Sequence, residues 1–198
     1  MSRRSRGRAT ESSSYDLARF DSVGEAPEAF TAVTVPTASL AARREHSVFV
    51  ANTDNAPSVA ALAAPGACNA FLYAAYGVSG AGTGTFVTNA RVAPVESGGI
   101  LGAWASAVTA NNTVAGAVSL FAADGAYLIG GRSGAAATAD AVKASMRTAP
   151  QLGNWSDAVS DLSTPRFLPG SARVGAFLYF VGGWDGTAPL ASAEFNVR

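Results

Sequence analysis

The residue types that most often carry chemistry are scarce in this sequence. Its 198 residues include one histidine, His46, and one cysteine, Cys68. A Ser-His-Asp triad would have to use His46, and one histidine with one cysteine cannot supply the ligands of a typical zinc site. Cys68 has no basic neighbour in AAPGACNAF, which favours a buried, unreactive thiol. We therefore expect no catalytic set, no metal and no cofactor.

A glycine-rich stretch at residues 77–84 has the composition of a phosphate-binding loop. A Walker loop, however, ends in Gly-Lys-Ser/Thr, and a dinucleotide-binding loop leads into a helix. Here Phe86-Val87-Thr88 follows, which is a strand pattern, and no lysine is near. We interpret this stretch as a flexible loop between blades.

Charge is balanced overall but unevenly distributed. There are 14 Lys and Arg against 14 Asp and Glu, and four of the arginines (Arg3, Arg4, Arg6, Arg8) fall in the first ten residues. Residues 1–14 are predicted to be a disordered basic N-terminus, without the apolar stretch of an export signal. The rest shows no basic patch and no apolar run of about 20 residues, so we expect neither nucleic-acid binding nor a membrane span.

Two markers repeat along the chain with one period. The segments FLYAAYG, AYLIGG and LYFVGG contain Tyr73, Tyr127 and Tyr179, which are 54 and 52 residues apart. The segments LGAWASAV and LGNWSDAV place Trp104 and Trp155 51 residues apart. Two independent markers with one spacing indicate a repeat architecture. The repeat positions are Tyr73, Gly77, Trp104, Tyr127, Gly130, Gly131, Trp155, Tyr179, Gly182 and Gly183.

The stretches between the markers have the pattern of short strands. Residues 112–120 carry spaced apolar side chains and lead to Asp124-Gly125, a typical hairpin signal. Further strands are predicted at 127–130, at 141–147 and from Trp155. Gly, Pro, Ser and Thr interrupt every longer window, which disfavours helix. Each repeat is therefore predicted to be an up-and-down antiparallel sheet of four strands, in an all-β protein.

These markers resemble the Kelch repeat of β-propellers. In that family a strand ends in Tyr-x-x-Gly-Gly, and a Trp opens the outer strand roughly 25–30 residues later, in blades of about 50 residues. Tyr127 and Trp155 are 28 residues apart, and Tyr73 and Trp104 are 31 apart. The resemblance covers residues 15–198 and implies propeller blades at 15–34, 42–108, 112–160 and 164–198. It also implies that Trp104 and Trp155 pack between blades.

The chain departs from the family pattern at Tyr76, which occupies the place of the first glycine of the pair. An aromatic residue adopts a positive φ poorly, so we expect an altered turn there. The expected strands fall in groups of two, four, four and three, whereas closed propellers have about four to eight blades. We expect the chain not to close by itself. A fragment is favoured over an open array or half of a propeller completed by a second copy.

In a propeller, the loops between second and third strands and those between blades share one face, here called the loop face. On this sequence it comprises residues 37–44, 79–85, 110–113, 132–138, 163–166 and 184–189. Its candidate partner-binding residues are Arg43, Arg44, Asn111, Asn112, Arg132, Ser133, Arg166, Trp184 and Asp185. Arginines at blade junctions suit anionic or carboxylate ligands. The alternative is that these are solvated loop charges with structural pairs, and that Trp184 anchors its loop.

The leading hypothesis for function is a non-enzymatic interaction module whose loop face recognises a protein or glycan. One alternative is a fragment of a propeller oxidase or glycan-active enzyme whose other catalytic residues lie in missing blades. Another is a structural repeat of a surface or adhesin-like protein. Low charge and scarce cysteine favour an extracellular or cell-surface bacterial protein.

Overall fold

The computed structural model describes residues 14–17, 31–34, 40–52, 70–81, 84–96, 100–109, 113–147, 150–158 and 160–197. All regular structure within these ranges is β-strand, and none of it is helix, which confirms the predicted all-β class. The same residues accordingly contain no helix able to cross a bilayer. The basic N-terminal arginines, Cys68 and most of the 51–69 insertion lie outside the described residues.

Three antiparallel sheets form the body of the protein. The first sheet has the order β3-β4-β7-β8, with strands Ser47–Asn52, Ala70–Ala75, Asn89–Pro94 and Ala105–Thr109. The second sheet has the order β9-β10-β13-β14, with strands Val118–Ala122, Gly125–Ile129, Ala141–Ala144 and Ser156–Asp157. The third sheet has the order β15-β16-β17, with strands Gly170–Val174, Phe177–Val181 and Ala193–Val197. Each is an up-and-down sheet, as predicted.

Three two-stranded sheets complete the described structure. They pair β1 (Ser14–Leu17) with β2 (Thr31–Thr34), β5 (Val78–Ser79) with β6 (Thr85–Phe86), and β11 (Arg132–Ser133) with β12 (Ala136–Ala137). The glycine-rich stretch, expected to be a flexible loop between blades, instead forms part of the β5–β6 hairpin. This hairpin lies in the connection from β4 to β7, within one sheet rather than between two. The first strand of the second sheet begins at Val118 rather than Asn112.

The first and second sheets pack face to face around a stack of aromatic rings. Strand β3 alternates buried and outward residues, which directs Phe49 inward beside Tyr73 of β4. Their ring centroids are 4.9 Å apart, and Phe121 of β9 lies 6.2 Å from the first ring and 6.3 Å from the second. The main core of the protein therefore lies between these two sheets.

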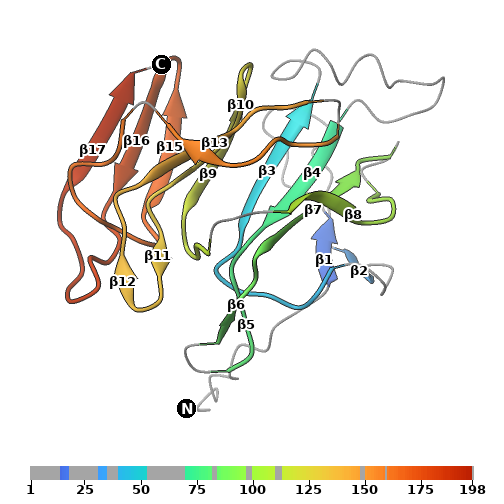
Figure 1. Ribbon diagram of the computed structural model, residues 1–198, viewed down its shortest axis with the longest axis horizontal. Helices are drawn as coiled ribbons and strands as arrows, with labels where there is room; N and C mark the ends of the chain where they lie inside the picture. The colour runs from blue at the N-terminus through green and yellow to red at the C-terminus, as the bar shows by residue number, and fades with distance from the viewer. Residues whose placement is uncertain are drawn as a thin grey trace, which may run out of the picture.

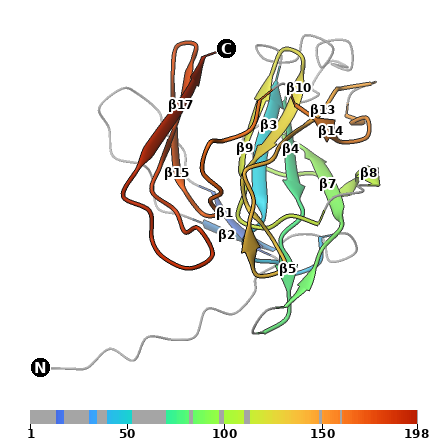
Figure 2. The ribbon, with the colours of Figure 1, turned by 60° about the vertical axis from the view of Figure 1, so that its left-hand side comes forward.

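The opposite face of the second sheet packs against the third. Leu120 and Ile129 contact Leu178 and Phe180 of β16, with Val118 in the same cluster. The three sheets thus follow one another across the molecule, as Figure 1 shows, with the third sheet at one end of the series (Figure 2).

The three repeated tyrosines occupy the same position in their sheets. Each lies on the second strand of its sheet, between two neighbouring strands. The paired residues are Phe49 and Val92 for Tyr73, Leu120 and Lys143 for Tyr127, and Ala172 and Phe195 for Tyr179. Tyr73 is fully buried, Tyr127 is 7% exposed, and Tyr179 is 37% exposed. The three tyrosines are therefore equivalent in position and differ in how far their side chains are buried.

The two repeated tryptophans also match. Leu101 bridges to Val95, and Leu152 bridges to Met146, so each LG-x-W segment folds back on its own sheet. Trp104 and Trp155 are both buried. Trp155 lies in the core between the first and second sheets, whereas Trp104 packs with Ala74, Ala93 and Leu101 of its own sheet.

The prediction of an altered turn at Tyr76 was wrong. Its φ is +58° and that of Gly77 is +93°, against +66° and +103° for Gly130 and Gly131. The Tyr76 ring is fully buried and lies edge-on to Trp155, with centroids 5.8 Å apart. Burial of a large aromatic ring offsets a backbone cost of about 1–2 kcal/mol for a left-handed residue.

Candidate functional site

The described loops of the predicted loop face lie at one end of the sheets. The hairpins β5–β6 and β11–β12 both extend from this end (Figure 1). Backbone hydrogen bonds link consecutive sheets there, from Gly116 N to Glu45 O (2.7 Å) and from Leu168 N to Gly116 O (2.8 Å). All three residues have positive φ, so the junction is the same in each repeat.

Arg166 is fully buried rather than presented to a partner. Its Nη1 donates to the carbonyls of Gly182 (3.0 Å) and Ser192 (3.2 Å), and its Nη2 lies 2.6 Å from Glu194 Oε1. Burial opposes ionisation of Glu194, but hydrogen bonds from the side chain and backbone of Ser163 and from Arg166 outweigh it and lower its pKa to about 2. This arginine therefore joins β17 to the connection that precedes the third sheet.

Arg43 has the same role in the first sheet. It is buried, and its Nη1 donates to the carbonyls of Tyr76 (3.4 Å) and Asn89 (3.3 Å). Its Nη2 donates to Asn89 Oδ1 at 3.1 Å. Burial, together with the charge of Arg91, lowers the pKa of Arg43.

Arg132 on β11 contacts the segment before β3, the β5–β6 hairpin and the segment before β15. Its Nε is 2.7 Å from Glu45 Oε2, and its guanidinium carbon lies 5.4 Å from the ring centroid of Phe86 and 6.0 Å from that of Phe167. Arg44 pairs with the other oxygen of Glu45. The cationic groups of Arg43, Arg44, Arg132 and Arg166 are therefore engaged within the protein, and three of them, Arg43, Arg132 and Arg166, are buried rather than solvated.

The remaining candidates are more open. Ser133 is exposed, and Trp184 is 39% exposed while its backbone bridges to Phe167. Asp185 accepts hydrogen bonds from the amides of Ala188 and Thr187, which lower its pKa. Asn111 and Asn112 lie outside the described residues.

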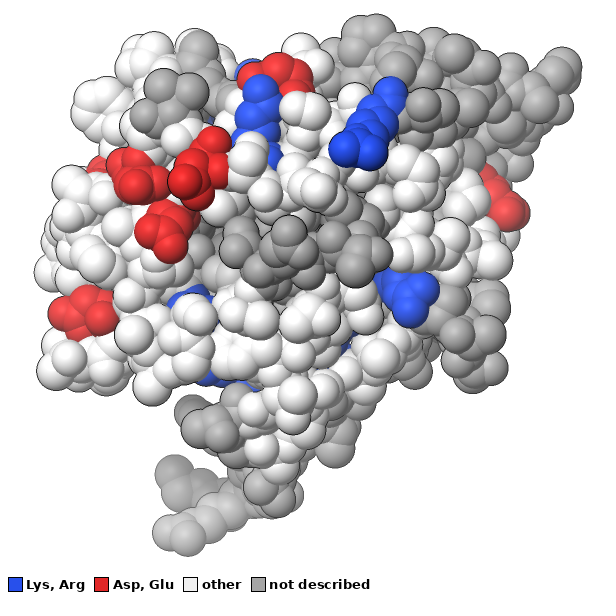
Figure 3. All heavy atoms as spheres, in the orientation of Figure 1, with Lys and Arg blue, Asp and Glu red and all other residues white. Residues whose placement is uncertain are grey.

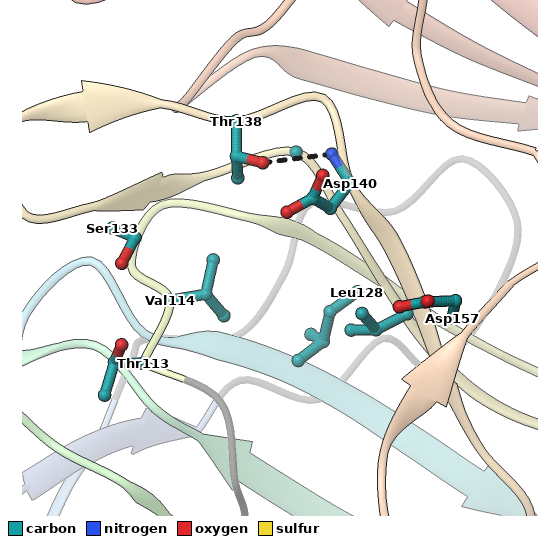
Figure 4. Close-up of a pocket in the computed structure, with 9 residues that line it drawn as sticks. Thr113, Val114, Leu128, Ser133, Thr138, Asp140 and Asp157 are labelled. Atoms are coloured by element: carbon teal, nitrogen blue, oxygen red, sulfur yellow. Dashed lines mark hydrogen bonds between the residues drawn. The ribbon is translucent and has the colours of Figure 1, made fainter.

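A cavity of about 200 Å³ opens among the loops of the second sheet. Its lining includes Val114, Gly130, Thr138, Asp140 and Asp157. Figure 4 shows the Asp140 carboxylate directed toward the space between these residues, and the Asp140 amide bonded to Thr138 Oγ1 (3.1 Å). The Asp140 carboxylate has no hydrogen-bond donor and no ion pair among the described residues. The signal in the sequence that could have indicated this cavity is Val114, which stands where the first and third sheets have Arg43 and Arg166.

The third sheet has a second unusual surface, which we call the outer aromatic face. It is the side turned away from the second sheet (Figure 2), and its large side chains are Val174, Phe177, Tyr179, Val181, Phe195 and Val197. The three rings contact one another, with centroids 5.9 to 6.3 Å apart. Sequence reasoning missed this surface, although FLYFV is apolar on both sides of the strand.

The charged residues suggest no further binding site among the described residues. Charged side chains are sparse over most of the view in Figure 3. No group of three potential metal ligands occurs among the described residues. Partial burial and the charge of Arg43 lower the pKa of His46.

Comparison with protein-family models gives no match for this chain, and comparison with curated proteins also gives none.

Proposed function

We propose that the chain is an interaction module of Kelch-type β-propeller architecture, which assembles with a second copy of itself and presents its loop face to a protein or glycan. The repeat supports this proposal. Each sheet has a tyrosine near the centre of its second strand, and a positive-φ pair follows that strand. Propellers stack such sheets radially, so that each sheet covers the apolar face of its neighbour.

The outer aromatic face is the observation that carries the proposal. Phe49 and Tyr73 of the first sheet are covered by Phe121 of the second. The third sheet carries Tyr179 and Phe195 on the corresponding side, where Phe195 is 63% exposed. An apolar surface of this kind on a β-sheet marks a docking site. All six large side chains are uncharged, so another apolar sheet face can cover them without burying an unpaired charge.

The outer face of the first sheet offers part of a matching surface, beside the buried cluster of Ala74, Ala93, Leu101 and Trp104. By register, Val48 and Val50 of β3 correspond to Ser119 and Phe121 of β9, the residues of the second sheet that face the first. Val48 is 46% exposed. We therefore assign the occupant of the outer aromatic face as the first sheet of a second copy, in a head-to-tail contact.

Sedimentation velocity over a range of concentrations tests this contact. We expect the wild-type chain to associate, and we expect Phe195→Lys and Val48→Lys each to abolish association, because either change places a charge in an apolar contact. An equal mixture of the two variants should associate again, since each retains the surface that the other has lost. Ile100→Lys, at an exposed apolar residue in a loop, is the matched control and should behave as the wild type.

Two outcomes would overturn the head-to-tail assembly. One is a wild-type chain that stays monomeric at every concentration. The other is association that Phe195→Lys removes but Val48→Lys leaves intact, because two outer aromatic faces would then pair with each other.

The loop face is the second surface of the proposed module. Trp184 is its exposed aromatic residue, and aromatic side chains are favoured at contact sites. Trp184→Ala should leave self-association and the unfolding midpoint unchanged, which would separate the loop face from the assembly surface. A large loss of stability would instead identify Trp184 as a loop anchor.

A further inference from the structure

The second sheet lacks an arginine that the first and third sheets both have. In each sheet the residue that follows the positive-φ pair forms a bridge, and the bridges are Arg44–Val78, Ala115–Arg132 and Phe167–Trp184. The residues directly before Arg44, Ala115 and Phe167 are Arg43, Val114 and Arg166. The three positions are therefore equivalent, and only the middle one is valine.

The two arginines bind equivalent acceptors. Arg43 donates to the carbonyls of Tyr76 and Asn89, and Arg166 donates to those of Gly182 and Ser192. Each guanidinium also donates to the side chain of the residue that supplies the second carbonyl, Asn89 Oδ1 (3.1 Å) in one sheet and Ser192 Oγ (3.2 Å) in the other. The repeat thus contains a guanidinium site made of two carbonyls and one side-chain oxygen.

Gly130 and Asp140 supply these acceptors in the second sheet. The Gly130 amide donates to Asp140 O at 2.9 Å, as the Tyr76 amide donates to Asn89 O and the Gly182 amide to Ser192 O. Val114 is too short to reach them, and the cavity of about 200 Å³ lies among these three residues. The side-chain acceptor here is a carboxylate rather than an amide or a hydroxyl.

We propose that this cavity, here called the Val114 cavity, binds the guanidinium group of a ligand in the place that Arg43 and Arg166 fill in the other sheets. Asp140 supplies the counter-charge, and Asp157 adds a second carboxylate on the lining. The proposed site is distinct from the outer aromatic face and does not depend on self-association.

The acceptor geometry favours guanidinium over other cations. Guanidinium is planar and presents several N–H groups in a fixed fork, which suits two carbonyls and a carboxylate at once, whereas an ammonium group is a compact point charge. No group of three potential metal ligands occurs in the described part of the chain, so a metal ion has fewer suitable partners here.

Titration of the ¹⁵N-labelled chain with methylguanidinium chloride at constant ionic strength, followed by NMR, tests the site. We expect saturable shifts at the amides of Gly130, Gly131 and Asp140, and none with methylammonium chloride. Asp140→Asn should weaken binding about tenfold, because it removes the charge from a charge-assisted hydrogen bond. Glu96→Gln, at an exposed carboxylate outside the cavity, is the matched control and should bind as the wild type.

Val114→Arg provides an independent test because it restores the arginine of the other repeats. It should abolish the methylguanidinium shifts and raise the urea midpoint. Asp140→Asn tests the site on its own if Val114→Arg does not fold. Equal shifts with methylammonium, or undiminished binding by Asp140→Asn, would overturn the proposal.

The same titration distinguishes two sources of the guanidinium group. N-acetyl-arginine methylamide imitates an arginine within a polypeptide. Tighter binding of this compound than of methylguanidinium would support the site and assign it to an arginine side chain of a protein. Equal binding would support it as a site for small guanidine compounds.

Discussion

The second and third sheets have the same strand order but opposite surroundings. The second sheet packs against a neighbour on each side, through Phe121 on one face and Leu120 on the other. The third sheet packs only through Leu178 and Phe180, and its other face carries exposed aromatic rings. Equivalent positions therefore contribute to stability in one sheet and are available for binding in the other. The difference is set by the neighbouring sheet rather than by the residue type.

Alanine substitutions at the three repeated tyrosines test this comparison most directly. Tyr73→Ala should cost about 3–5 kcal/mol in free energy of unfolding, because it removes a fully buried ring. Tyr179→Ala should cost much less, since a large part of its side chain is already in water. Tyr127→Ala should fall between them. Urea denaturation at a concentration that keeps the chain monomeric measures all three, and equal costs would contradict the comparison.

The pH dependence of stability tests how the third sheet is attached. The pKa of Glu194 is lowered from its ordinary value of 4.5 to about 2, so its contribution is complete above pH 4.5 and is lost as the pH falls toward 2. Glu194→Gln should therefore be less stable than the wild type at pH 7, and the difference should shrink between pH 4.5 and 2. Thermal unfolding across this range measures it. A difference that stays constant with pH would show that the carboxylate charge is unimportant.

Two phenylalanine substitutions should have the smallest effects, and they sharpen the description of the first interface. Tyr73 donates a hydrogen bond to the Pro150 carbonyl at 2.8 Å, so Tyr73→Phe should cost about 1 kcal/mol. The buried hydroxyl of Tyr76 has no hydrogen-bond partner among the described residues, so Tyr76→Phe should be neutral or slightly stabilising. Urea midpoints compare the two, and a reversed order would contradict this assignment of the two hydroxyls.

The repeat was the part of the fold that the sequence predicted best. The spacing of Tyr73, Tyr127 and Tyr179 predicted that they occupy equivalent positions, and the dipeptide Asp124-Gly125 predicted the turn between β9 and β10. Periodicity could not predict the left-handed backbone of Tyr76, because the packing of its ring against Trp155 stabilises it and that contact joins residues far apart in the chain.

The candidate site was harder to predict than the fold. Arg43, Arg132 and Arg166 were selected as binding residues because arginines at blade junctions or after the glycine pair suit anionic or carboxylate ligands. Their side chains instead bond to acceptors within the protein, some of them far away in sequence, such as Gly182 for Arg166 and Glu45 for Arg132. Val114 drew no attention because a valine carries no chemistry, and its meaning depends on comparison with the equivalent arginines.

The sequence by itself determined the local elements: short strands, tight turns and their recurrence about every fifty residues. These depend on side-chain alternation and turn residues, which act over a few positions. The tertiary structure decided which sheet faces are covered, which arginines are engaged in internal hydrogen bonds and ion pairs, and where a cavity opens. Burial and ion pairing depend on which distant segments meet, and this is why the outer aromatic face and the Val114 cavity emerge only when the sheets are assembled.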